Sequence, residues 1–160
     1  MKQLTLQIPI SVYDYEELSA EDRALIDQAK EATRRSYVPY SHFHVGAAVR
    51  LSGGEIISGS NQENAAYPSG TCAERTTLFY AGSQYPTQAI LTLAVAARNE
   101  QGNFLDSPIP PCGACRQVML EAEKRFKQPM RILLYGTSGV YEFGSVDGLL
   151  PFSFDADAMR

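Results

Sequence analysis

Three cysteines in two short clusters constrain this chain more than any other feature of its sequence. The first cluster is Cys72-Ala73-Glu74, and the second is Pro111-Cys112-Gly113-Ala114-Cys115. The two sulfurs of a Cys-x-x-Cys pair at a helix start lie about one turn apart on the same face, so they can hold one metal ion. A third thiolate has to come from elsewhere, and Cys72 is the only candidate. The fold is therefore expected to bring two distant segments to one point.

The number and setting of these cysteines indicate one catalytic zinc per chain. A catalytic zinc uses three protein ligands and keeps its fourth position for a water, whose pKa it lowers to about 7. Glu74 lies two residues after Cys72, where it can act on that water as a general acid and base without being a ligand. Both clusters lie at predicted helix N-termini, where the helix dipole favours thiolate charge.

Charge balance gives the neighbouring arginines an expected role. Three thiolates (−3) and one Zn²⁺ (+2) leave a net charge of −1, which makes the metal a weaker acid toward its water. Arg75 and Arg116 each directly follow a cluster. We expect them to donate hydrogen bonds to the sulfurs and so to restore part of that acidity.

The cysteines have two other interpretations. A Cys-x-x-Cys pair can be a redox pair, or half of a structural zinc site in a module without catalytic activity. A structural site prefers four protein ligands, and His42 or His44 is available as the fourth. Glu74, next to the third cysteine, favours catalysis over both alternatives.

Periodicity and turn residues predict a three-layer α/β/α sandwich with a mixed, roughly five-stranded sheet. Ser19-x-x-Asp22 and Thr71-x-x-Glu74 have the spacing of capping boxes and open two of the three expected helices. Pro110-Pro111 precedes the third. The helices are expected over residues 19–37, 71–81 and 111–127, and the strands over 42–51, 55–60, 89–97, 130–135 and 140–143.

Composition limits the class of protein. The 160 residues suit one domain over 1–160, in which the first dozen or so residues are assigned no role. A net charge of −4 argues against a nucleic-acid partner. Residues 1–10 lack the pattern of a secretion signal, and no apolar run approaches the roughly 20 residues of a membrane span. We therefore expect a cytoplasmic protein that does not interact with membranes.

Several motifs together resemble the cytidine deaminase family, in its compact, homotetrameric, three-cysteine form. The two cysteine clusters resemble the zinc deaminase signature in its all-cysteine variant. Further matching segments follow in the family's order: Pro39-Tyr40-Ser41-His42-Phe43-His44-Val45-Gly46-Ala47-Ala48, Gly59-Ser60-Asn61-Gln62-Glu63-Asn64-Ala65-Ala66-Tyr67-Pro68, Cys115-Arg116-Gln117-Val118 and Leu149-Leu150-Pro151-Phe152-Ser153-Phe154. The resemblance covers about residues 37–154.

The resemblance implies a role for each matching position. It assigns zinc binding to Cys72, Cys112 and Cys115, and proton transfer to Glu74. Contacts with the nucleoside are implied for Asn61 and Glu63 at the sugar hydroxyls, Phe43 beside the pyrimidine ring, and the backbone of Ala73 at the base. Tyr67 and Phe154 match positions that complete a neighbouring subunit's pocket, which implies a homotetramer, with a homodimer as the alternative.

The implied reaction is hydrolytic deamination of cytidine or deoxycytidine by zinc-activated water, as in pyrimidine salvage. The alternatives are a deaminase of another aminated nucleoside and a deaminase of blasticidin-like antibiotics, and Asn61-x-Glu63 and Arg75 argue against the antibiotic. Deoxycytidylate and tRNA-adenosine deaminases normally carry histidine where Cys72 stands. The chain departs from the family at Gln62, often apolar elsewhere, and in the proline-rich stretch 106–111.

Overall fold

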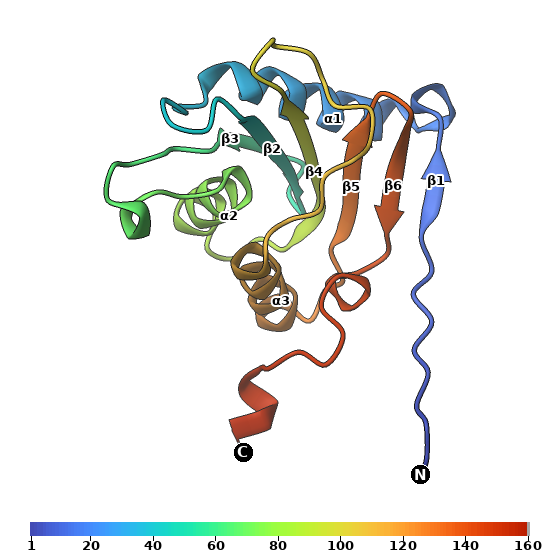
Figure 1. The fold of residues 1–160 in the computed structure, drawn as a ribbon. Coiled ribbons are helices and arrows are strands. Elements are labelled where there is room, and N and C mark those ends of the chain that lie inside the picture. The colour runs from blue at the N-terminus through green and yellow to red at the C-terminus, as the bar shows by residue number, and fades with distance from the viewer. Residues whose placement is uncertain (160) are drawn as a thin grey trace.

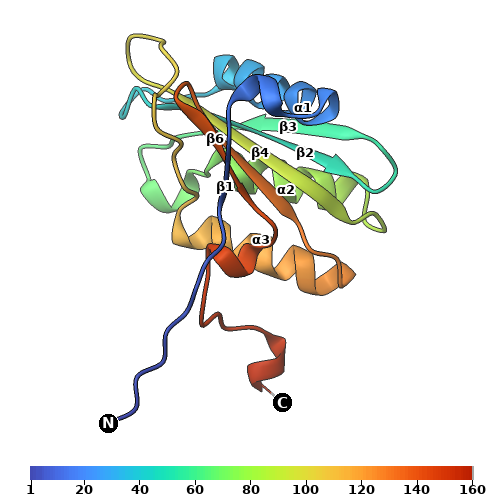
Figure 2. The ribbon, with the colours of Figure 1, turned by 90° about the vertical axis from the view of Figure 1, so that its right-hand side faces the viewer.

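A sheet lies between one helix and a pair of helices in the computed structural model, which describes residues 1–159 (Figures 1 and 2). Helix α1 (Ala20–Ala32) covers one face of the sheet, and α2 (Ala73–Gln84) and α3 (Gly113–Phe126) cover the other. The predicted three-layer α/β/α arrangement is confirmed. None of the helices described is both long and apolar enough to cross a membrane.

The sheet is mixed and has six strands rather than the expected five. Its order is β1-β6-β5-β4-β2-β3, and only β4 and β5 pair in parallel. The strands are β1 (Ser11–Tyr13), β2 (His44–Leu51), β3 (Ile56–Ser60), β4 (Ile90–Arg98), β5 (Arg131–Gly136) and β6 (Gly139–Phe143). The additional strand is β1, at the edge of the sheet, and its three residues are too few to show a period in the sequence.

The central strand β4 explains why a nearly all-apolar run occurs in the sequence. Its odd-numbered residues Leu93, Val95 and Ala97 belong to the core under α2 and α3. Its even-numbered residues Ala94 and Ala96 belong to the core under α1. Since successive side chains of a strand point to opposite faces, a strand covered on both faces has to be apolar throughout.

Two glycines let the helices approach the sheet closely. A Cβ atom at Gly46 of β2 would collide with the carbonyl oxygen of Ala29 in α1. A Cβ atom at Gly59 of β3 would lie 2.7 Å from the Thr77 hydroxyl oxygen of α2. A side chain at Gly46 would push α1 away from β2, and one at Gly59 would push α2, the helix that begins after Cys72, away from the strand that leads to Asn61.

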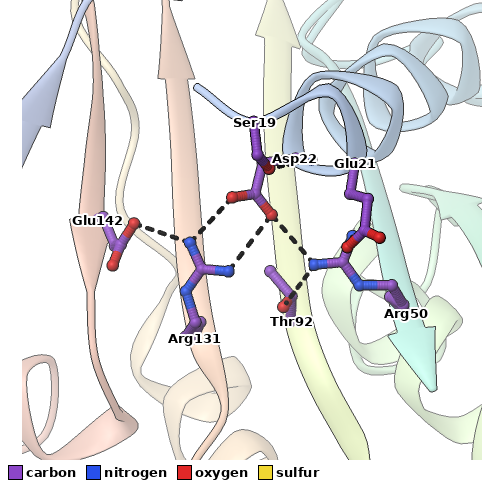
Figure 3. Close-up of polar contacts among 7 residues, drawn as sticks. All are labelled: Ser19, Glu21, Asp22, Arg50, Thr92, Arg131 and Glu142. Carbon is purple, nitrogen blue, oxygen red and sulfur yellow. Dashed lines mark hydrogen bonds and ion pairs between the residues drawn. The ribbon is translucent and has the colours of Figure 1, made fainter. Parts of the chain in front are cut away.

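The start of α1 is fastened to the sheet by a partly buried ion-pair cluster (Figure 3). Ser19 caps the helix as predicted, because its hydroxyl oxygen accepts a 3.1 Å hydrogen bond from the backbone amide of Asp22. The Asp22 carboxylate, only 8% exposed, accepts hydrogen bonds at 3.0 Å from both Arg50 of β2 and Arg131 of β5. Arg131 also donates to Glu142 of β6 at 2.9 Å. One carboxylate therefore connects α1 to two strands directly and to a third through Arg131.

Replacing Asp22 with alanine is expected to lower the free energy of unfolding by about 3 kcal/mol. This is the low end for breaking a buried ion pair, because Arg131 keeps Glu142 as a partner. Burial opposes ionisation of Asp22, but hydrogen bonds from Arg131 and Arg50 outweigh it and hold the pKa below the ordinary 3.8. The contribution of ionised Asp22 to the free energy of unfolding is therefore complete at pH values above that ordinary pKa. It is lost as the pH falls through the lower pKa that Asp22 has in the folded state.

Urea unfolding of the zinc-saturated protein at neutral and acidic pH measures this contribution. Glu21→Ala is the matched control, because the Glu21 carboxylate is 82% exposed and lies 3.7 Å from Arg50. Such an exposed pair contributes less than about 1 kcal/mol. Equal destabilisation by both variants would show that Asp22 has no special role.

Candidate metal centre and active site

A cysteine stands at the N-cap of each of the two neighbouring helices α2 and α3. Cys72 precedes α2 and Cys112 precedes α3, both with extended backbone. The expected capping box at Thr71 and Glu74 is wrong by one residue, because the N-cap is Cys72 and it makes no side-chain capping bond. Both N-cap sulfurs therefore lie at the positive end of a helix, which favours the thiolate form.

The three cysteine sulfurs converge at one point. The Sγ atoms of Cys72 and Cys112 are 3.7 Å apart, and those of Cys112 and Cys115 are 3.4 Å apart. All three lie within 4.8 Å of one another. A tetrahedral zinc with Zn–S bonds of about 2.3 Å places its sulfurs about 3.8 Å apart. The donor type, number and spacing all fit zinc with a fourth position left for another ligand.

Hydrogen bonding within this cluster lowers the pKa of Cys72 to about 5. The largest contribution comes from the Cys115 thiol, and a further one from Arg75, whose Nη2 lies 3.7 Å from the Cys72 sulfur. Cys115 is fully buried, and its hydrogen bond to Cys72 together with burial raises its own pKa. The positive charge of Arg75 beside the sulfurs would offset the formal charge of −1 at a three-thiolate zinc site.

Arg116 does not make the contact expected of it. Its Nε donates to the Pro111 carbonyl at 2.8 Å, and its Nη1 donates to the Leu149 carbonyl at 2.6 Å. The guanidinium therefore ties the loop before Cys112 to the C-terminal segment instead of bonding to a sulfur. Arg116 can steady the position of the loop through these two carbonyls.

Glu74 is the second residue of α2 and lies deep in the protein, with only 4% of its surface exposed. Burial raises the pKa of its carboxyl group, and the neighbouring charge of Cys72 raises it further. A buried carboxyl group with a raised pKa beside a metal site can both accept and donate a proton during a reaction. This is the environment that a general acid and base needs.

A cavity of about 250 Å³ opens next to the cysteine cluster. It brings together four residues predicted for the site, Asn61, Glu63, Tyr67 and Cys72, with Arg75. Its other lining residues are Gln62, Asn64, Gly70 and Thr71, which sequence analysis did not assign. Small-molecule pockets usually measure about 300–1,000 Å³, so this cavity is small and open for a nucleoside.

Asn61 and Glu63, two residues apart just after β3, both line this cavity. The Asn61 side chain accepts a hydrogen bond from the backbone amide of Val45 and donates one to the Phe43 carbonyl, both at 2.9 Å. The Glu63 carboxylate accepts the backbone amide of Tyr40 at 2.9 Å. Both residues thus brace the segment before β2, and each retains hydrogen-bonding capacity for a hydroxyl group.

Phe43 and Ala73 lie on the core side of the site. Phe43 is half-buried and packs against the same hydrophobic core that contains Ala73. Ala73 is the first residue of α2 and is fully buried. Its amide belongs to the first turn of the helix, where N–H groups have no partner within the helix and can bond a ligand.

Tyr67 and Phe154 are open to solvent, with exposed fractions of 80% and 62%. Tyr67 lines the cavity, whereas Phe154 lies on the C-terminal segment, whose carbonyl at this residue accepts a hydrogen bond from Gln117 of α3 at 2.8 Å. Two residues before Phe154, Phe152 has a positive φ of 55°. His42, which lies just before β2, also has a positive φ, of 53°. The structure therefore brings Tyr67 to the site of its own chain but not Phe154.

The hydroxyl groups of Thr71 and Thr76 are contacts that sequence analysis missed. Thr76 donates to the Cys72 carbonyl at 3.0 Å, and Thr71 donates to the same carbonyl at 3.4 Å. The spacing of Cys72 and Thr76, four residues apart across a helix start, is the signal that could have identified the first of them. Together they fix the backbone that carries one of the three sulfurs.

Replacing Arg75 with glutamine is expected to shift the acid limb of the pH–rate profile to higher pH. Loss of its charge raises the pKa of Cys72 and leaves more negative charge on the metal's ligands, which makes the metal a weaker acid. Initial rates across a pH series measure the shift. Arg75→Lys, which keeps the charge, is the matched control. An unshifted profile in the glutamine variant would remove Arg75 from the tuning of the site.

The chain matches known deaminases over most of its length. The family described as "Cytidine and deoxycytidylate deaminase zinc-binding region" matches residues 19–128. A cytidine deaminase from Halalkalibacterium halodurans is 41% identical over 136 residues, which are 85% of this chain and 96% of that protein. One from Sporosarcina psychrophila is 41% identical over 133 residues, covering 83% of this chain and 90% of that protein.

Solved structures agree with these relatives. The crystal structure of cytidine deaminase from Burkholderia pseudomallei has a TM-score of 0.70 and 37% sequence identity, covering 86% of this chain and 100% of that one. That of cytidine deaminase from Mycobacterium tuberculosis has a TM-score of 0.67 and 30% identity, with coverages of 86% and 99%. With three converging thiols, a buried glutamate and this likeness in sequence and structure, the chain belongs to the zinc-binding cytidine and deoxycytidylate deaminase family.

Proposed function

We propose that this chain catalyses the hydrolytic deamination of cytidine or deoxycytidine, with uridine or deoxyuridine and ammonia as products. The observation that carries the proposal is the meeting of three sulfurs within 4.8 Å, next to a cavity lined by Asn61 and Glu63. Membership of the family and the names of the relatives support the same reaction.

Cys72, Cys112 and Cys115 would hold the zinc ion, one per chain. When bound, zinc acidifies a water molecule in its fourth coordination position and so supplies the nucleophile at neutral pH. Glu74 would move two protons in turn. It would accept one from the attacking water and deliver it to ring N3 of the pyrimidine while the oxygen bonds to C4. It would then take the hydroxyl proton from that oxygen and deliver it to the exocyclic amine, so that the C4–N bond breaks, ammonia leaves and the oxygen remains as the C4 carbonyl.

The remaining site residues position the nucleoside. Asn61 and Glu63 would bind the sugar hydroxyls, with Glu63 ionised. Hydrogen bonds from the Ser41 side chain and from backbone amides hold the pKa of Glu63 below its ordinary value. Phe43 would pack beside the ring, and the free amide of Ala73 would bond the base. Geometry that holds a reactant in place supplies a large part of the rate of such a reaction.

A homotetramer is part of the proposal, and a homodimer is the alternative. The cavity of one chain is small, open on one side and flanked by the exposed Tyr67. Phe154 is exposed but does not reach the cavity of its own chain. A neighbouring subunit that contributes Phe154 would close the wall and exclude water, as closed symmetric assemblies allow.

We further propose that residues 1–160 form one deaminase domain that acts in pyrimidine salvage in the cytoplasm. The three ligand cysteines have to stay reduced to bind a metal, which fits a reducing compartment. The net charge of −4 suits a small neutral nucleoside better than a polynucleotide.

Ammonia release from a panel of aminated compounds tests the proposed reaction. The zinc-loaded protein is incubated with cytidine, deoxycytidine, deoxycytidylate, adenosine and a blasticidin-type antibiotic. We expect release from the first two at rates far above the others. Preference for deoxycytidylate or for the antibiotic would replace the proposed substrate, and no release from any compound would contradict deaminase activity.

A mixing experiment tests the shared pocket. Glu74→Gln and Phe154→Ala chains, each nearly inactive alone, are expected to regain part of the activity when they are dissociated and reassembled together. A mixed assembly can form a pocket with Glu74 from one chain and Phe154 from the other. Sedimentation of the mixture confirms assembly. A monomer with full specific activity would instead make Phe154 an ordinary surface residue.

A further inference from the structure

Residues 1–10 form an extended arm that leaves the body of the protein before edge strand β1 (Figures 1 and 2). Apolar and other side chains alternate along it, and its apolar series continues into β1: Leu4, Leu6, Ile8, Ile10 and Val12. All five are substantially exposed, from 43% at Ile8 to 74% at Leu4. The arm makes no hydrogen bond with any residue that the structure describes. This is the pattern of a strand with one apolar face that the described residues of its own chain leave largely uncovered.

The arm stands away from its own body and leaves apolar space beside it. One cavity of about 280 Å³ lies between Leu6 and Ile8 of the arm and Leu150 and Phe152 of the C-terminal segment. A second, of about 330 Å³, lies on the other side of Ile8 against Phe143. Figures 1 and 2 show that the arm and the C-terminal segment leave the body toward the same side. The two segments thus form an open cleft whose walls are mostly apolar, with Asp147 as its charged residue.

We propose that this cleft binds the arm of a second copy of the chain, and that the two arms exchange around a two-fold axis. A second copy fits because one symmetric contact fills both clefts at once and buries both apolar faces. The same segment can pair with itself antiparallel. In a register that pairs even-numbered residues of one arm with even-numbered residues of the other, the even-numbered side chains of both arms lie on one face.

Charge agrees with this occupant. The arm's only charged side chain is Lys2, which is positive, whereas the acidic Asp147 lines both cavities next to the arm. Insertion of a second arm would therefore bring positive charge toward a carboxylate. Pro9 has no N–H group, so backbone pairing is confined to residues 2–8 and side-chain packing supplies most of the affinity.

This contact is distinct from the catalytic site, and it does not rest on the proposed activity. The arm lies before β1 at one edge of the sheet, whereas the cysteines lie at the starts of α2 and α3. The proposal concerns how copies are held together, and its test needs no substrate.

Sedimentation over a range of concentrations, with zinc bound, tests the exchange. The variant Leu4→Ser/Leu6→Ser/Ile8→Ser removes the apolar face, and Gln3→Ser/Thr5→Ser/Gln7→Ser changes the opposite face as a matched control. The first should weaken association of the arm-linked copies by about 100-fold or more, because several Leu and Ile side chains lose their burial. The control should associate like the unchanged chain.

Zinc content and the unfolding midpoint show that each variant is folded. The double variant Leu4→Ser/Leu6→Ser, at the two apolar positions of the arm farthest from β1, repeats the test without changing Ile8. Unchanged association of the apolar-face variants would overturn the proposal, as would an equal loss in the control. Binding of the unchanged chain to lipid vesicles, with its association unaffected by the apolar-face variants, would assign the arm to a membrane instead.

Discussion

Glu74→Gln is expected to lower kcat for cytidine by about 10²–10⁴-fold or more, while one zinc ion per chain is retained. Glutamine has nearly the same shape but cannot carry a proton. Because Glu74 is proposed to act both on the attacking water and on the leaving amine, its loss affects more than one step. The carboxyl group is buried and is not one of the three converging ligands, so the metal site should remain intact.

Steady-state kinetics together with zinc analysis separate these effects. Glu63→Gln is the contrasting variant: Glu63 is proposed to bind a sugar hydroxyl, so its replacement should raise KM more than it lowers kcat. The unfolding midpoint of each variant provides the control for folding. Near-normal kcat in Glu74→Gln would remove Glu74 from the mechanism, and loss of zinc in that variant would show that it is a ligand.

Cys112→Ala is expected to lose most of the zinc and, with it, nearly all activity. The Cys112 sulfur lies 3.7 Å from that of Cys72 and 3.4 Å from that of Cys115. Two remaining thiolates cannot complete a three-ligand site, and a metal that binds only the folded state stabilises it. The variant should therefore also unfold at a lower temperature than the zinc-loaded parent.

Elemental analysis after dialysis, followed by thermal unfolding with and without added zinc, measures both losses. Gly113→Ala is the matched control, because it changes the residue between the ligands and its added Cβ meets nothing within 4 Å. It should keep its zinc. Full zinc occupancy in Cys112→Ala would mean that the metal is held by other residues.

The core of the fold could be predicted because its signals are local. The all-apolar run of β4, the Gly53-Gly54 turn between β2 and β3, and Ser19 at the start of α1 each specify their own element. Strand β1 could not be predicted in this way, since its three residues form a strand only by pairing with β6. At α2, a cysteine took the capping position, and Thr71 has the spacing of a cap without filling it.

The residues of the metal centre could also be predicted from local signals, whereas several hydrogen bonds and ion pairs that join distant segments could not. The three cysteines and Glu74 follow from short motifs whose geometry is set by the helix. Arg116 bonds to the Leu149 carbonyl because the C-terminal segment folds back onto α3. No local sequence pattern predicts the path of that segment. The ion-pair cluster around Asp22 joins residues from α1, β2, β5 and β6, so only the assembled sheet reveals it.

The left-handed backbone of His42 and Phe152 bears on how this protein can be made more stable. A bulky side chain at positive φ, as at Phe152, costs on the order of 1–3 kcal/mol, and histidine tolerates the conformation somewhat better. Glycine at Phe152 or His42 would relieve the strain but would also make these backbone segments more flexible. At His42, which directly precedes the proposed ring-packing residue Phe43, a gain in stability would therefore compete with the positioning of the substrate.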